Sequence, residues 1–93
     1  MAFGALNGCV TERPNIELVL TREAFAAAQE VDAAKYSPVN FLKAEEIYRR
    51  AMQSYKLQKY KEAIVDFKTA RSLAERAENT ARIQRQKAGE EAL

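Results

Sequence analysis

Residues 60–81, YKEAIVDFKTARSLAERAENTA, decide the fold of this chain. Seven side chains recur there at alternating spacings of three and four: Tyr60, Ala63, Phe67, Ala70, Ala74, Ala77 and Ala81. This spacing places them in one narrow row along a helix, which we call the alanine seam. Because most members are alanine, the backbone of another helix can approach closely. The seam therefore needs partner helices to bury it.

Two upstream segments supply these partners. The first, at about 15–36, contains no helix breaker and carries a similar row: Leu20, Ala24, Ala27, Val31 and Ala34. Ile16 and Val19 add bulk at its start, and Phe25 covers the edge of the row. The second, at about 38–57, has its own row: Phe41, Ala44, Tyr48, Ala51 and Tyr55. The sequence therefore predicts three amphipathic helices of comparable length.

Two short breaks separate the three predicted helices. Proline disfavours helical geometry in the residue before it, so Ser37-Pro38 ends the first helix, with Ser37 as the N-cap of the second. The second break, at 56–59, lacks glycine and proline. We place it there because an unbroken helix from 37 to 88 would be roughly 75 Å long and would bury little. The third helix stops near Gly89. We expect an all-α, antiparallel three-helix bundle with helices at about 15–36, 38–57 and 60–88.

The domain organisation follows from these helices. Residues 14–89 form one three-helix domain, residues 1–13 form a flexible N-terminal tether, and residues 90–93 fray at the C-terminus.

The composition argues against catalysis. The chain has 93 residues, a formal net charge of +2 with interspersed signs, and no histidine. The lack of histidine removes the commonest general base and the commonest metal ligand. No glycine-rich phosphate loop is present. The carboxylate pairs Glu45-Glu46, Glu62 with Asp66, and Glu90-Glu91 are expected to be solvated helix surface. We expect no enzymatic activity, no cofactor and no metal.

A basic cluster surrounds the second break, interleaved with Tyr48, Tyr55 and Tyr60: Arg49, Arg50, Lys56, Lys59 and Lys61. Tyrosines among cations are a feature of nucleic-acid binding. Here, however, the tyrosines occupy row positions, where packing already accounts for them. We therefore favour a mildly cationic surface facing anionic envelope polymers or a partner over nucleic-acid binding.

The N-terminal run Leu6-Asn7-Gly8-Cys9 resembles a bacterial lipobox, in which a small residue precedes a cysteine that is lipidated after signal cleavage. Asparagine is unusual at its position in that motif. The run also lacks a preceding basic region, and its apolar segment is shorter than the usual 7–15 residues or so. The alternative is an incidental cysteine. We predict lipidation at Cys9.

Two resemblances extend this interpretation. Residues 51–70 resemble one tetratricopeptide-type hairpin, since Ala51, Ala63, Phe67 and Ala70 match its small and aromatic positions, with Gln58 where that motif usually has glycine. One such unit does not make a repeat array.

Residues 14–81 resemble the DUF4398 family of alanine-rich, three-helix envelope domains, often found behind a lipoprotein signal. That match is carried by Pro14, by the alanine cluster of Ala24, Ala27 and Ala28, and by two runs: Ala34-Lys35-Tyr36-Ser37-Pro38 and Tyr60-Lys61-Glu62-Ala63. The family supplies no catalytic residues.

These patterns predict a periplasmic, lipid-anchored helical adaptor or structural protein of the bacterial envelope, with an unidentified protein partner there. Past Ala77 large apolar residues become scarce, so the second half of the seam is covered either by the first helix or by another molecule. The candidate partner-binding residues are Ala74, Ala77, Ala81 and Ile83. The alternative is a soluble helical interaction module, not lipidated, that self-associates through its own seam as a homo-oligomer.

Overall fold

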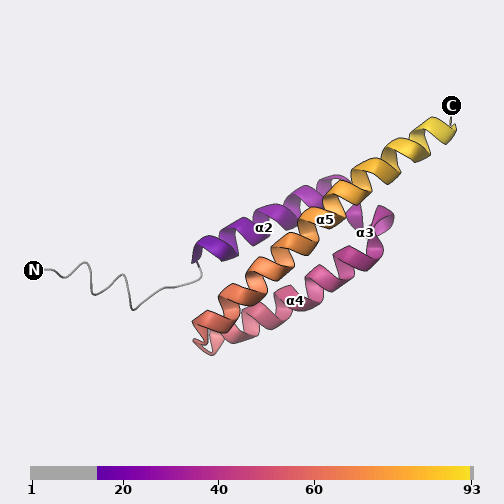
Figure 1. Ribbon diagram of the computed structural model, residues 1–93. Helices are drawn as coiled ribbons and strands as arrows, with labels where there is room; N and C mark the ends of the chain where they lie inside the picture. The colour runs from indigo at the N-terminus through magenta and orange to yellow at the C-terminus, as the bar shows by residue number, and fades with distance from the viewer. Residues whose placement is uncertain (1–14, 93) are drawn as a thin grey trace, which may run out of the picture.

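The computed structural model describes residues 15–92 of the chain, which form four helices and no strand. They are α2 (Asn15–Glu30), α3 (Ala33–Tyr36), α4 (Pro38–Lys56) and α5 (Tyr60–Ala92). In Figure 1, α5 lies between α2 and α4; α4 runs antiparallel to the other two. The predicted all-α, up-down-up bundle is therefore confirmed. The predicted tether and Cys9 lie outside the described residues.

The alanine seam is the core of the molecule. Six of its seven members are fully buried, with Tyr60 partly buried: Ala63, Phe67, Ala70, Ala74, Ala77 and Ala81. They face Ala24 and Ala28 of α2, and Phe41, Ala44 and Ala51 of α4. The seam in 60–81 and the row in α4 were both predicted correctly, because each repeats without ambiguity every three or four residues.

Aromatic rings fill the space that the alanines leave between the helices. Phe25 of α2 contacts Phe41 and Tyr48 of α4, with ring centroids 5.8 and 5.3 Å apart. Tyr48 in turn lies 5.9 Å from Phe67 of α5. Such pairs stabilise by about 0.5–1.5 kcal/mol beyond the area that they bury. Phe25 therefore packs beside Ala24 and Ala28, at the edge of the row of its own helix as predicted, and it links the two outer helices.

The row predicted on the first helix was correct at Ala24 and Val31 and wrong by one position at its other three members. Thr21, Ala24, Ala28 and Val31 are buried, whereas Leu20 and Ala27 are only half-buried. Ala34 is exposed, and so are Ile16 and Val19, which do not add bulk to the core. Three consecutive alanines, 26–28, fit more than one face, so the alanine pattern alone did not identify the buried side.

The first predicted helix is broken in two at Val31-Asp32. Asp32 has left-handed backbone angles, φ 56° and ψ 46°, and its carbonyl accepts hydrogen bonds from the amides of Lys35 and Tyr36. Aspartate is among the few residues that tolerate this conformation. The prediction of a continuous helix over 15–36 is thus corrected to a helix, a corner and one further turn. Ser37 holds the predicted N-cap position, but its side chain makes no capping hydrogen bond.

The second break lies where predicted, at residues 57–59. Gln58 has φ 61°, a left-handed conformation that a glycine would adopt with less strain. Gly89, in contrast, does not stop the third helix. It lies inside α5, which continues to Ala92, and it does not take the left-handed angles with which a glycine ends a helix. A glycine inside a helix merely weakens it.

We expect Ala70→Leu to lower the free energy of unfolding by about 1–3 kcal/mol, because the added atoms have no space between α5 and its neighbours. Thr69→Leu is the matched control, since Thr69 is exposed on the same turn, and it should change stability by less than about 0.5 kcal/mol. Urea denaturation followed by circular dichroism measures both. Equal effects of the two substitutions would show that Ala70 is not on the buried face.

We expect Gln58→Gly to raise the free energy of unfolding by roughly 0.5–1 kcal/mol, because glycine adopts the left-handed angles of this turn without a clash. Gln53→Gly, on the exposed side of α4, should instead lower it by about 0.5–1 kcal/mol. The urea midpoints of both variants against the parent protein test this. A loss of stability in both would mean that Gln58 is not strained.

Candidate functional site

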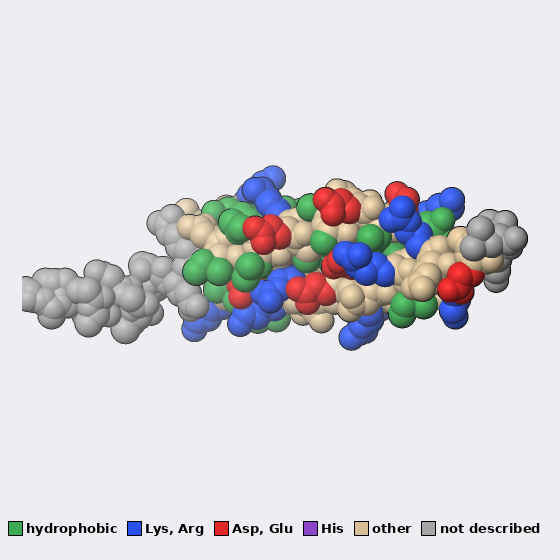
Figure 2. Space-filling view, turned by 90° about the horizontal axis from the view of Figure 1, so that it is seen from above, with side chains coloured by type: hydrophobic (Ala, Val, Ile, Leu, Met, Phe, Trp, Pro, Cys, Tyr) green, Lys and Arg blue, Asp and Glu red, His purple; other side chains and the backbone are tan. Residues whose placement is uncertain are grey.

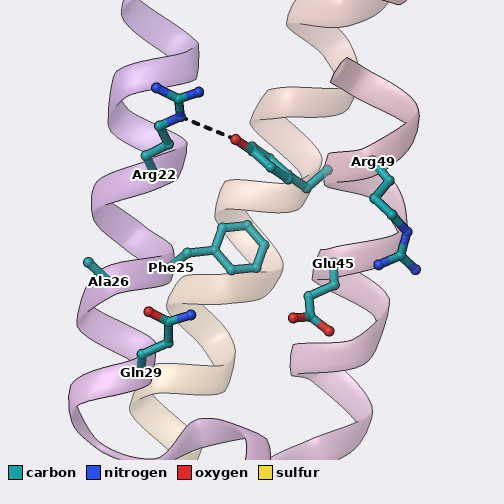
Figure 3. Close-up of a pocket in the computed structure, with 7 residues that line it drawn as sticks. Arg22, Phe25, Ala26, Gln29, Glu45 and Arg49 are labelled. Carbon is teal, nitrogen blue, oxygen red and sulfur yellow. Dashed lines mark hydrogen bonds between the residues drawn. The ribbon is translucent and has the colours of Figure 1, made fainter. Parts of the chain in front are cut away.

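A groove of about 290 Å³ separates α2 from α4 on one side of the bundle (Figure 3). Both helices line it: Arg22, Phe25, Ala26, Gln29, Glu45, Tyr48 and Arg49. Phe25 and Tyr48, held by their mutual ring contact, form its apolar part. Charged groups of both signs surround them. The groove can therefore hold an apolar or aromatic side chain next to a polar group.

Arg22 is held at one side of the groove by Tyr48. Nε of Arg22 donates to the Tyr48 hydroxyl at 3.2 Å, and this hydrogen bond raises the pKa of the Arg22 guanidinium. Arg22 therefore stays cationic at every pH at which a protein is folded, and an arginine cannot serve as a general base. Sequence analysis did not predict this groove, since it depends on how far α2 and α4 diverge.

The candidate partner residues do not form one surface. Ala74, Ala77 and Ala81 are fully buried, packed on Ala24, Ala28, Ala33 and Phe41 of the same chain. These alanines are covered by helices of the same chain, α2, α3 and α4, rather than by another molecule, so their assignment to a partner is corrected. Only Ile83 is accessible, with an exposed fraction of 55 %. It lies on the part of α5 past Ala81, where residues 82–90 are all exposed.

The residues of the basic cluster near the second break lie in different surroundings. Arg50 makes two hydrogen bonds to Asp66, at 3.0 and 3.1 Å, which join α4 to α5 and raise the pKa of the Arg50 guanidinium. Arg49 lines the groove. The three lysines, Lys56, Lys59 and Lys61, are exposed. Tyr48 and Tyr55 are half-buried against the core, as their row positions predicted.

The remaining surface carries mixed charge. On the face in Figure 2, acidic and basic side chains alternate along the bundle, with hydrophobic side chains between them. Within residues 15–92, no three histidine, cysteine, aspartate or glutamate side chains gather as a metal site would require. None of the helices described here combines the length and apolarity needed to cross a membrane.

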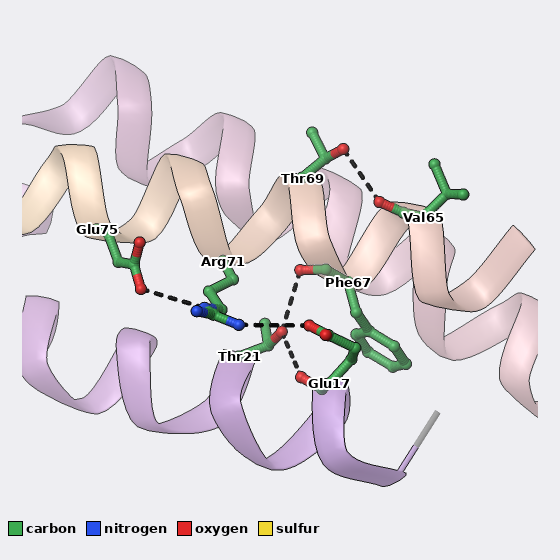
Figure 4. Close-up of polar contacts among 7 residues, drawn as sticks. All are labelled: Glu17, Thr21, Val65, Phe67, Thr69, Arg71 and Glu75. Carbon is green, nitrogen blue, oxygen red and sulfur yellow. Dashed lines mark hydrogen bonds and ion pairs between the residues drawn. The ribbon is translucent and has the colours of Figure 1, made fainter. Parts of the chain in front are cut away.

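Thr21 forms the polar junction between α2 and α5 (Figure 4). Its fully buried hydroxyl oxygen lies 2.6 Å from the carbonyl oxygen of Glu17, one turn earlier, and 3.0 Å from that of Phe67. Arg71 of α5 adds an ion pair to the same junction, since its guanidinium lies 3.5 Å from the Glu17 carboxylate; its contact with Glu75, at 3.2 Å, is within α5. Sequence reasoning missed Thr21, since a threonine in a helix usually faces solvent unless a carbonyl is there to accept its proton.

Comparison with known proteins places the chain in a family context. The family model described as "Domain of unknown function (DUF4398)" matches residues 17–93. Neither the curated proteins nor the solved structures that were searched give a match. The matched range includes most of α2 and all of α3, α4 and α5, so the groove, the seam and the Thr21 junction all lie within the family domain.

We expect Thr21→Val to lower the free energy of unfolding by about 1 kcal/mol, because valine preserves the volume but cannot donate to Phe67. Thr69→Val is the matched control. Its exposed hydroxyl bonds only within its own helix, to Val65, and its loss should cost less than about 0.5 kcal/mol. Chemical denaturation measures both. The junction would be refuted if Thr21→Val were as stable as the parent.

Proposed function

The chain belongs to the DUF4398 family, and from this membership and the residues around Cys9 we propose a function without catalysis. We propose that it is a helical adaptor or structural protein of the bacterial cell envelope, in the periplasm, attached to a membrane by a lipid on Cys9. The run Leu6-Asn7-Gly8-Cys9 carries this proposal, because a small residue directly before a cysteine is the feature that a lipobox requires.

The short distance between Cys9 and the folded domain supports a role close to the membrane. Only residues 10–14 separate Cys9 from Asn15, the first residue of α2. Six peptide steps span at most about 20 Å. A lipid on Cys9 would therefore hold the bundle next to the membrane rather than far from it. Such a position suits a protein that joins an envelope component to the membrane surface.

Two accessible surfaces support the adaptor part of the proposal. One is the groove between α2 and α4, with its aromatic part and its mixed charges. The other is the C-terminal extension of α5, residues 82–90, where Ile83 is an exposed large apolar side chain among polar neighbours. Both are open to a protein partner while the core remains closed.

The alternative, self-association of an unlipidated module, has less support. It required a seam left exposed for a second copy, whereas α2, α3 and α4 of the same chain cover the seam. The C-terminal extension of α5, with Ile83, is one surface that stays open to a second copy.

The test is the intact mass of the protein purified from membranes of its native bacterium. We expect a chain that begins at Cys9 and carries acyl chains, and we expect Cys9→Ser to move the protein to the soluble fraction. Thr11→Ser, a conservative change two residues away, should leave both the acylation of Cys9 and the membrane location unaltered. An unmodified Cys9, or a protein found only in the cytosol, would refute the lipid anchor and favour the alternative.

A further inference from the structure

One end of the bundle gathers three lysines and two exposed apolar side chains. These five residues, which we call the basic end, are Ile16, Lys56, Leu57, Lys59 and Lys61. The start of α2 meets the last turn of α4 there, since the Tyr55 hydroxyl donates to Oδ1 of Asn15 at 3.2 Å. Figure 1 shows the start of α2 and the α4–α5 turn at the same end of the molecule. The two segments therefore form one continuous surface.

The charge of the basic end is not neutralised within the described part of the chain. None of Lys56, Lys59 and Lys61 pairs with a carboxylate among residues 15–92. Residues 55–61 contain no acidic side chain, and Glu62 is the first one after them. Glu17, near the start of α2, is already engaged by Arg71. Among the described residues of this end, three unpaired lysines are thus opposed by Glu62.

The apolar side chains lie among these lysines. Ile16 is 73 % exposed and Leu57 is 65 % exposed, so neither belongs to the core. A lysine close to an anionic membrane contributes an attraction that falls off within a Debye length. An exposed leucine or isoleucine gains further by entering the boundary between headgroups and acyl chains. Lysines together with exposed apolar side chains fit a surface that has anionic groups outside and an apolar layer below them. A bilayer with anionic phospholipid is such a surface.

We propose that the basic end binds the surface of a membrane that contains anionic phospholipid, so that this end of the bundle contacts the membrane. The inference rests on the proposed lipid anchor, because the tether from Cys9 enters the bundle at Asn15, within the same end. It adds an orientation, in which Leu57 lies at the headgroups while the α5 extension and Ile83 point away from the membrane. The partner surfaces would then face the interior of the compartment.

The structure offers a matched comparison for this proposal. A second basic surface, between α4 and α5, carries Lys43, Lys68 and Arg76 around Ile47 and Leu73. It also has three cations without an ion pair in the described residues. However, Lys43 lies 13 residues before Lys56 on α4, roughly 20 Å further along the helix. The side surface therefore lies further than the basic end from Asn15, where the tether enters the bundle.

The experiment uses the one cysteine of the chain to replace the biological anchor with a chemical one. The full chain is coupled through Cys9 to maleimide-bearing lipid in vesicles of phosphatidylcholine, with or without phosphatidylglycerol. Tryptophan is absent from the sequence, so Leu57→Trp introduces a single reporter. Val39→Trp, at the far end of α4 and 76 % exposed, is the control reporter.

We expect the emission of the Leu57→Trp reporter to shift to shorter wavelength on vesicles with phosphatidylglycerol. The shift should be lost in 1 M salt, where the Debye length is about 3 Å. The Val39→Trp reporter should not shift. Adding Lys56→Gln, Lys59→Gln and Lys61→Gln should abolish the shift, whereas adding Lys43→Gln, Lys68→Gln and Arg76→Gln should preserve it. Both triple variants lose the same charge, and circular dichroism checks that both are folded.

Three results would overturn the proposal: no shift with phosphatidylglycerol, an equal shift without it, or equal losses in the two triple variants. Because the tether is made chemically, this outcome does not depend on whether the cell lipidates Cys9. Failure of the orientation and failure of the biological anchor are therefore seen in separate experiments.

Discussion

The close approach of α5 to its neighbours is the constraint on which the rest of the structure depends. A row of small side chains, from Ala63 to Ala81, leaves little volume between α5 and the helices that cover it. Burial of so few large side chains yields limited hydrophobic stabilisation, and a domain of this size is only marginally stable. The contacts that join the helices therefore matter individually: the rings around Phe67, the Thr21 hydroxyl, and the Arg50–Asp66 pair.

The same constraint explains the two corners of the chain. For α2 and α4 both to lie on α5, the chain must reverse within a few residues, and it does so with a left-handed residue at each corner. Neither residue is glycine. Asp32 tolerates these angles, while Gln58 holds them against its own preference. The cohesion of the core is thus strong enough to impose a strained turn on the backbone.

Because the core is closed within one chain, the alanine seam is not accessible to other molecules. The seam is covered from within, so the binding surfaces that we propose are the groove between α2 and α4, the extension of α5, and the basic end. These surfaces are separated along the length of the bundle. The basic end and the α5 extension lie at opposite ends in Figure 1, so a membrane and a protein partner would not compete for one face. That separation is what an adaptor requires.

The sequence by itself determined the all-α class, the α4–α5 hairpin, the faces that α4 and α5 bury, and the break at 57–59. In α5 and α4 the apolar residues repeat every three or four positions, and only one face fits them. The sequence did not determine the buried face of α2, because Ala26, Ala27 and Ala28 fit more than one face. Only the tertiary structure decided it, by placing the Phe67 carbonyl, 46 residues away, where Thr21 can donate to it. The corner at Asp32, the groove and the basic end likewise depend on how the helices are set against one another, which no local pattern specifies.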